Sequence, residues 1–308
     1  MRSLRLLVPL LVAVGLVAVP GPATPAPADA PLPRYREYVA LGDSWTADVV
    51  ILNTDGFPAT RHAPIGCGQS HRNYPKLVAK TIGARAFRDA SCGSATTDDL
   101  THPQTGLPAG GVNPPQFDRL TRRTDLVTVG IGGNDAGIAA AGIDCFNLLP
   151  VESPLPTDGL LPELPLPFVG GNLPPLGGCK KKYTRGGVDR LARNIRESEP
   201  KLVRALRRIH RISPDARILV VDYMSVVPDH ACYPLVPATD EDMRYIHNKF
   251  RQLNAMVARA ARRGGAELVK THARSVGHDL CKGARERYAE TLGLSVNDPA
   301  VGVPAHPR

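Results

Sequence analysis

Residues 126–133 have the sequence LVTVGIGG, and this stretch decides which fold the chain adopts. Its first four residues form a short, nearly continuous apolar run that ends at glycines. Such a run is typical of a β-strand buried on both faces of a sheet. The stretch therefore predicts a central strand that leads directly into a tight, glycine-rich turn.

Strand and helix signals alternate on both sides of this stretch. In the helix predicted at 188–212, apolar residues recur at helical spacing, and Thr239 is the expected N-cap of the helix at 239–263. This alternation predicts one α/β domain whose parallel sheet is covered by helices on both faces. The other predicted elements are strands at 38–41, 86–88, 218–221 and 267–269 and a helix at 74–82.

The first 30 residues have the anatomy of a secretory signal peptide. Arg2 and Arg5 precede the apolar segment 6–19, and Ala28-Asp29-Ala30 fits the A-x-A cleavage pattern. A membrane anchor is the alternative, but the apolar segment is short for a bilayer span. We expect a secreted, extracellular protein that is cleaved near Ala30 and forms a single domain over residues 31–308.

The chain's six cysteines fit an exported protein. They form no C-x-x-C pair, which disfavours zinc and redox motifs. Many pairings remain open, of which the sequential one is the simplest, and buried free thiols are the alternative. The cysteines are Cys67, Cys92, Cys145, Cys179, Cys232 and Cys281.

Composition excludes several classes of protein. With 43% hydrophobic residues the chain is too apolar for a disordered protein, and its single tryptophan disfavours an aromatic surface for nucleic acid. The net charge is +9, and many cations fall on the predicted helix 188–212. They indicate either a patch for anionic surfaces or a solvated helix face, and the second interpretation is favoured.

Residues 150–178 are rich in Pro, Leu and Gly and show no helical or strand period. Loops of this length are usually functional or disordered. The segment lies between Cys145 and Cys179, so a disulfide there would tether its base. We interpret it as an insertion near the site, such as a lid; a surface loop without a role is the equal alternative.

Three polar blocks point to chemistry at one edge of the sheet. Ser44 lies in G-D-S at 42–44, the segment 92–97 has the sequence CGSATT, and Asn134 lies in G-G-N-D at 132–135. Ligands of parallel sheets bind at the carboxyl ends of the strands, where these blocks are expected. A dinucleotide site is disfavoured, because the G-x-G-x-x-G pattern that starts at Gly130 ends in Asp135.

Together the blocks predict acyl transfer. Ser44 provides the nucleophile, and its own N–H, the N–H of Gly93 or Ser94, and the Asn134 side chain form an oxyanion hole. The chain has no H-E-x-x-H motif, so we predict no metal. It also lacks G-x-S-x-G, which argues against an ordinary α/β-hydrolase nucleophile elbow.

The order and spacing of these blocks resemble the GDSL or SGNH hydrolases. The resemblance extends through the sequence GHDLC at 277–281 to His306-Pro307. It is strongest to the secreted, three-disulfide lipases and esterases of actinomycetes. It implies a three-layer, flavodoxin-like fold and hydrolysis of carboxylic esters without a cofactor. It also favours the sequential disulfides Cys67–Cys92, Cys145–Cys179 and Cys232–Cys281.

The resemblance also implies roles for single residues. Ser44 matches the family's nucleophile, Asn134 its oxyanion asparagine and His306 the histidine of its terminal H-P motif. The family usually has C-S-G-A-T-T where this chain has C-G-S-A-T-T. The oxyanion glycine therefore falls on Ser94, with Gly93 as the nearest glycine.

Two departures from the family's pattern surround His306. The family often has Asp three residues earlier, where this chain has Val303. The resemblance implies that a backbone carbonyl orients the histidine, with Asp298 as an alternative. The sequence stops at Arg308, so we expect His306 on an unanchored tail.

His278 competes for the role of the base, and we interpret it as structural or substrate-facing. The remaining histidines have no partner pattern and are expected at the surface or in satisfied positions. They are His62, His71, His102, His210, His230, His247 and His272.

We therefore expect an exported serine esterase or lipase. Its expected substrates are lipids or acyl esters, with transient contact to a lipid surface, no nucleic-acid partner and a monomeric state. One alternative is a carbohydrate acetylesterase of the same family. The other is a secreted binding protein that resembles the family but has lost turnover.

Overall fold

The computed structural model describes residues 34–52, 56–146, 177–233, 235–236, 238–290, 301–302 and 305–307. The predicted signal peptide, most of the 150–178 segment, Asp298 and Val303 lie outside the described residues. Within the described part, residues Arg34–Arg308 belong to one structural unit.

A parallel sheet forms the centre of this unit, as the alternation of strands and helices predicts. Its strand order is β3-β1-β4-β5-β6, and each neighbouring pair is parallel. The apolar stretch at 126–129 lies in β4, the middle strand of this order. The strands are β1 (Glu37–Gly42), β3 (Ala86–Asp89), β4 (Leu126–Gly130), β5 (Arg217–Val221) and β6 (Glu267–Val269).

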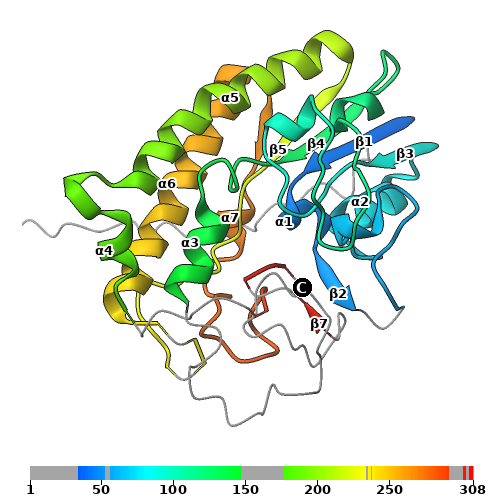
Figure 1. Ribbon diagram of the computed structural model, residues 1–308. Helices are drawn as coiled ribbons and strands as arrows, with labels where there is room; N and C mark the ends of the chain where they lie inside the picture. The colour runs from blue at the N-terminus through cyan, green and yellow to red at the C-terminus, as the bar shows by residue number, and fades with distance from the viewer. Residues whose placement is uncertain are drawn as a thin grey trace, which may run out of the picture. The chain divides into compact units, whose positions relative to one another are not determined.

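Helices cover both faces of the sheet, which makes three layers (Figure 1). The helices α5 (Arg190–Ile212) and α6 (Asp240–Gly264) pack side by side on one face, and α2 (Tyr74–Ile82) lies on the other. Alternate residues of β1 serve the two faces, since Val39 packs in the core of α5 and α6 while Tyr38 packs against the α2 side. The predicted fold class is confirmed.

The ends of these helices follow from their capping residues. The side chain of Asn73 accepts from Lys76 N at the start of α2, and Gly83, with a φ of 62°, ends it. Thr239 caps α6 by accepting from Asp242 N, as the sequence predicts, and Gly265 ends that helix. Asp189 caps α5, which therefore begins two residues after the predicted start.

The shorter helices and strands show no periodic pattern in the sequence. β2 and β7 pair antiparallel in a separate two-stranded sheet, and Figure 1 shows the two strands next to each other. The short elements are α1 (Ser44–Ala47), β2 (Val50–Leu52), α3 (Ile138–Cys145), α4 (Cys179–Tyr183), α7 (Thr271–Arg274) and β7 (Val301–Gly302). Single 3-10 turns occur at η1 (Ile65–Cys67), η2 (Asp98–Leu100), η3 (Gln116–Arg119) and η4 (Arg185–Gly187).

Three disulfides link these elements, with the sequential pairing that the family resemblance favours. Cys145–Cys179 joins the end of α3 to the start of α4. The carboxylate of Asp242, in the first turn of α6, accepts hydrogen bonds from the N–H groups of Cys179 and Lys180. The other two disulfides are Cys67–Cys92 and Cys232–Cys281. In the part of the chain that is described, no helix is long and apolar enough to span a bilayer.

Candidate active site

The three polar blocks meet at the carboxyl edge of the sheet. β1 and β4 are neighbours, with Gly42 paired to Gly130, so the segments that follow them lie side by side. The Cys92 N–H donates to Gly42 O over 3.1 Å, which ties the 92–97 block to the 42–44 block. Asn134 Nδ2 donates to Ala95 O over 2.8 Å and ties the 132–135 block to both.

Ser44 is the first residue of the short helix α1, directly after β1. Asp43 is the N-cap, and its carboxylate accepts from Trp45 N over 3.0 Å. The turn is tight, because a Cβ on Gly42 would lie 2.7 Å from Gly130 O. Ser44 is 8% exposed, and its N–H has no acceptor among the described residues. The helix start thus presents an N–H and a hydroxyl at the same point.

A buried tyrosine joins two of the site segments. Tyr223, which follows β5, donates its hydroxyl to Asp43 Oδ2 over 2.5 Å and accepts from Gly133 N over 2.7 Å. Burial raises the pKa of the Asp43 carboxyl to about 7, although hydrogen bonds from Tyr223 and Trp45 lower it. Burial also raises the pKa of Tyr223, and the Asp43 carboxylate adds to this shift. The phenol therefore stays protonated and acts as the donor to Asp43.

A buried glutamine side chain also holds the end of β1. Gln116 is fully buried, and its Oε1 accepts from Gly42 N over 2.8 Å while its Nε2 donates to Gly42 O over 2.9 Å. The side-chain amide and the Cys92 N–H thus satisfy the backbone groups of Gly42 beyond the end of the β1–β3 pairing. Both backbone groups that precede the serine loop are satisfied without water.

The structure distinguishes between the N–H groups of Gly93 and Ser94 as the second oxyanion donor. The Gly93 N–H donates to Cys67 O over 3.0 Å and is therefore occupied. The N–H of Ser94 has no acceptor among the described residues, and Ser94 is exposed. Ser94 also has a φ of 63°, in the left-handed region where glycine is favoured. This conformation fits the glycine that the family usually has at the position of Ser94.

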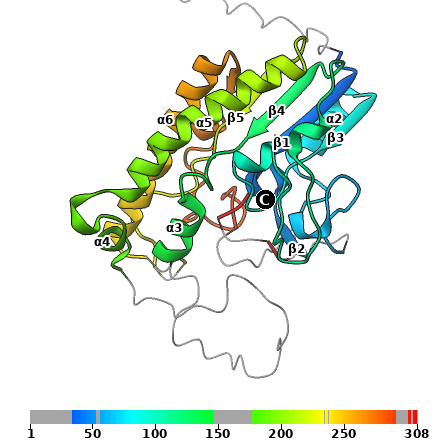
Figure 2. The same cartoon turned by 45° about the horizontal axis from the view of Figure 1, so that its top comes forward.

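His306 lies next to the serine helix. Its ring centroid is 6.2 Å from that of Trp45, the residue that follows Ser44. Figures 1 and 2 both place the red C-terminal residues near the carboxyl ends of β1 and β4. The sequence stretches that carry Ser44 and His306 are therefore brought together by the fold.

The expectation of an unanchored tail is wrong. The Glu290 N–H donates to His306 O over 3.1 Å, and the Ala305 N–H donates to Glu290 O over 2.7 Å. Ala289 and Pro307 form an antiparallel bridge beside these bonds. A short backbone ladder on both sides of His306 thus holds the segment against residues that are fully buried.

His278 takes part in local packing. Its ring stacks on Tyr288 with centroids 3.8 Å apart, and its Nδ1 hydrogen-bonds to Glu286 O over 2.6 Å. His247 is bonded similarly to Val227 O. In the described ranges, no group of three or more His, Cys, Asp or Glu side chains is placed to hold a metal ion.

Sequence reasoning missed Tyr223, Gln116 and Trp45. Trp45 touches Tyr223, Phe250 and His306 by its ring, so it fills the space between the serine helix and α6. Trp45 had a signal in the sequence, because it is the chain's only tryptophan and directly follows the nucleophile. Tyr223 and Gln116 had none, since neither belongs to a motif.

Comparisons with known proteins agree with this architecture. The model of the GDSL-like Lipase/Acylhydrolase family matches residues 40–297, which include all three polar blocks. Lipase 2 of Streptomyces coelicolor is 34% identical over 301 residues, which cover 96% of this chain and 87% of that protein.

Two solved structures share the fold. The extracellular lipase of Streptomyces rimosus superposes with a TM-score of 0.60 at 22% identity, covering 87% of this chain and 92% of that one. Phospholipase A1 of Streptomyces albidoflavus gives a TM-score of 0.59 at 20% identity over the same shares of both chains.

Proposed function

Because this chain belongs to the GDSL-like lipase and acylhydrolase family, whose members hydrolyse esters, we propose that it is an exported serine esterase or lipase with Ser44 as its nucleophile. The family membership predicted from the sequence is confirmed. The observation that carries the assignment of Ser44 is the junction of three segments around the start of α1, which brings a serine hydroxyl and unpaired N–H donors together.

In the proposed reaction Ser44 Oγ attacks the ester carbonyl while His306 takes the hydroxyl proton. The tetrahedral intermediate collapses as His306 returns this proton to the alcohol, which leaves an acyl-enzyme. His306 then takes a proton from water, which attacks the acyl group, and the acid is released with Ser44 restored. The bonds broken are the ester C–O bond and one O–H bond of water.

The site lowers the barrier most at the step in which the oxyanion forms. The N–H groups of Ser44 and Ser94 have no acceptor in the described structure. Asn134 uses one amide hydrogen for Ala95 O, which leaves the other for a ligand. Donors held in place before the reaction stabilise the negative charge without reorganising, and each is worth about 3–4 kcal/mol in the barrier.

The neighbourhood of His306 supports its role as the base. The ring lies against Trp45, and the backbone on both sides is paired with residues 289–290. Both constraints limit the motion of an imidazole that must reach Ser44 Oγ. His278 is stacked on Tyr288 and serves the packing of its own loop.

Lipids or other acyl esters are the proposed substrates, and secretion is the proposed location. Relatives of this chain include lipases and a phospholipase A1, and one of them is an extracellular lipase. The three disulfides fit an oxidising compartment. Cleavage of a signal peptide near Ala30 is part of the same proposal.

The test is hydrolysis of p-nitrophenyl esters from acetate to palmitate by the mature protein. We expect turnover that disappears in Ser44→Ala, together with loss of labelling by a fluorophosphonate probe. The dependence on chain length identifies the acyl group, and an optimum at acetate with turnover of acetylated sugar would favour a carbohydrate esterase. Unchanged turnover in folded Ser44→Ala would refute the assignment of the nucleophile.

A further inference from the structure

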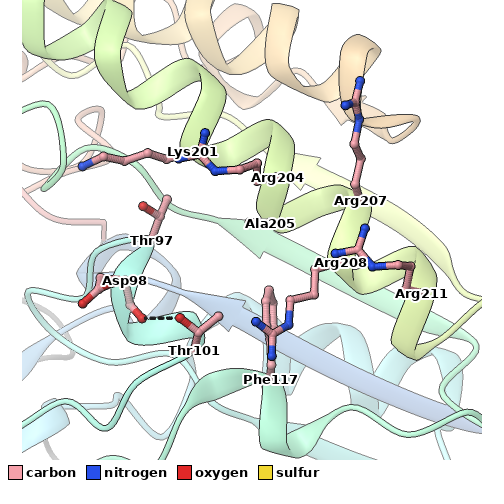
Figure 3. Close-up of a pocket in the computed structure, with 10 residues that line it drawn as sticks. All are labelled: Thr97, Asp98, Thr101, Phe117, Lys201, Arg204, Ala205, Arg207, Arg208 and Arg211. Carbon is pink, nitrogen blue, oxygen red and sulfur yellow. Dashed lines mark hydrogen bonds between the residues drawn. The ribbon is translucent and has the colours of Figure 1, made fainter.

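A cationic groove runs along α5, beside the site. It has a volume of about 550 Å³ and lies between α5 and the segments 97–101 and 116–119. Figure 3 shows the cationic side chains on α5 beside the Thr97–Thr101 segment, with Arg207 pointing away from that segment. The lining residues are Thr97, Asp98, Thr101, Phe117, Lys201, Arg204, Ala205, Arg207, Arg208 and Arg211.

The charge of this groove is poorly balanced. Of the lining side chains five are cationic and only Asp98 is acidic, and Asp98 lies 3.2 Å from His102. Arg204 and Arg211 have no ion pair or hydrogen bond among the described residues. Like charges three or four positions apart on a helix repel one another. A bound anion would remove this repulsion.

Within the groove, Arg207 donates to Arg263 O over 3.3 Å and Lys201 pairs with Asp135. Arg204 and Arg211 differ from these and from the cations nearer the start of the same helix. Arg193 lies 3.9 Å from Glu197, and Arg190 donates to Lys182 O, so both serve contacts within the protein. In the groove, Arg208 stacks over the Phe117 ring at 5.6 Å, which orients its guanidinium. The other groove cations are exposed, but together with this oriented guanidinium they line a concave surface, unlike cations on a convex helix face.

One end of the groove is connected to the proposed site. Lys201 lies 3.5 Å from Asp135, which directly follows Asn134. The same carboxylate accepts from the N–H and the hydroxyl of Thr97, so the groove begins where the 92–97 and 132–135 blocks are joined. A ligand held in this groove therefore lies alongside the segments that carry the oxyanion donors.

We propose that this groove binds the phosphate group of an anionic lipid and so holds the protein at a lipid surface. Guanidinium groups bind phosphate and carboxylate oxygens alike in pairs of parallel hydrogen bonds, and phosphate is the anionic group that a phospholipid surface presents. The chain is strongly basic, with a net charge of +9 over the full sequence, and this adds attraction to an anionic membrane at longer range. The choice of a lipid phosphate rests on the proposed function, whereas the preference for an anion rests on the groove alone.

The experiment measures vesicle binding by the full mature chain carrying Ser44→Ala, so that no lipid is hydrolysed. Phosphatidylcholine vesicles are compared with vesicles that also contain phosphatidylglycerol. The test variant is Arg204→Gln with Arg211→Gln. The matched control is Arg193→Gln with Arg196→Gln, which removes the same charge from exposed positions of the same helix. Thermal melting checks that both variants fold, and Arg204→Gln alone provides a milder test.

We expect binding that requires phosphatidylglycerol and weakens by roughly tenfold or more in the test variant, but less than about twofold in the control. Hydrolysis of a soluble ester by the groove variant with Ser44 intact should be unchanged. Equal losses in both variants would refute a specific groove, and equal binding to phosphatidylcholine would refute the anionic ligand. If inorganic pyrophosphate binds the groove but the vesicles do not, the lipid source is wrong. Because binding is measured without turnover, failure of the esterase proposal is seen separately, in the soluble-ester assay.

Discussion

Tyr223 Oη and Asp43 Oδ2 lie 2.5 Å apart, and this hydrogen bond links the segment after β5 to the turn that carries Ser44. The same phenol accepts from Gly133 N, one residue before Asn134. One side chain therefore sets the distance between the proposed nucleophile and the proposed oxyanion asparagine. A shift of either loop would stretch one of the two bonds.

Removing this hydroxyl should reduce catalysis more than it reduces substrate binding. In Tyr223→Phe, Asp43 loses a donor and Gly133 an acceptor, and each buried unpaired group costs about 1–3 kcal/mol. We expect kcat for a soluble ester to fall by roughly tenfold or more, with a smaller change in KM. Tyr288→Phe is the matched control, because Tyr288 is 41% exposed. An unchanged kcat in Tyr223→Phe would show that the phenol does not position the loops.

Asp43 should make stability depend on pH. The pKa of its carboxyl is about 7 in the folded protein, against an ordinary value of 3.8, so between these values the folded state keeps a proton that the unfolded chain releases. The contribution of Asp43 is therefore fully present below pH 4 and is lost as the pH rises towards 7, by about 4 kcal/mol in total. Urea unfolding of wild type and Asp43→Asn across this range tests the difference. If the two stability curves run parallel between pH 4 and 7, the folded pKa of Asp43 is not raised.

His306→Ala should lower kcat by at least roughly 10³-fold, because Ser44 then lacks a base. The control is His278→Ala, which removes a ring stacked on Tyr288 and should leave most of the activity. Rates on a soluble ester at saturating substrate provide the measurement. The opposite ranking of the two variants would transfer the role of the base to His278.

Ser94→Gly should stabilise the protein and leave it active. Ser94 has a φ of 63°, and a side chain in this region costs about 1 kcal/mol that glycine avoids. Catalysis should persist, because the backbone N–H is the proposed donor. Thermal melting and ester hydrolysis are measured together, and a large loss of activity would assign a role to the hydroxyl instead.

Gly93→Ala is the companion variant for this position. A Cβ on Gly93 would lie 3.2 Å from Cys67 O and 3.3 Å from Val49 Cγ2, so we expect a lower melting temperature. The melting temperature should therefore rise in Ser94→Gly and fall in Gly93→Ala. An unchanged melting temperature in Gly93→Ala would mean that the residues around the Cys67–Cys92 disulfide can shift to accommodate the added Cβ.

Much of the fold could be predicted because the elements that form it are long and carry their own signals. The bounds of α2 are those predicted, since Asn73 and Gly83 mark its ends. β4 follows from an uninterrupted apolar run. By contrast, α1 has only four residues and β7 only two, too few to show a period. Their positions depend on contacts with the rest of the molecule.

The sequence by itself determined the order of strands and helices and the three blocks that carry Ser44, residues 92–97 and Asn134. It did so because hydrophobic periodicity and short motifs depend only on residues that are neighbours in the chain. Only the tertiary structure decided that Gly93 N–H is taken by Cys67 O, that Tyr223 bridges Asp43 and Gly133, and that His306 lies beside Trp45 on a paired segment. Each of these contacts joins residues far apart in the chain. Whether an N–H donor is occupied or available depends on acceptors that folding brings close to it. These acceptors cannot be identified from a local sequence pattern.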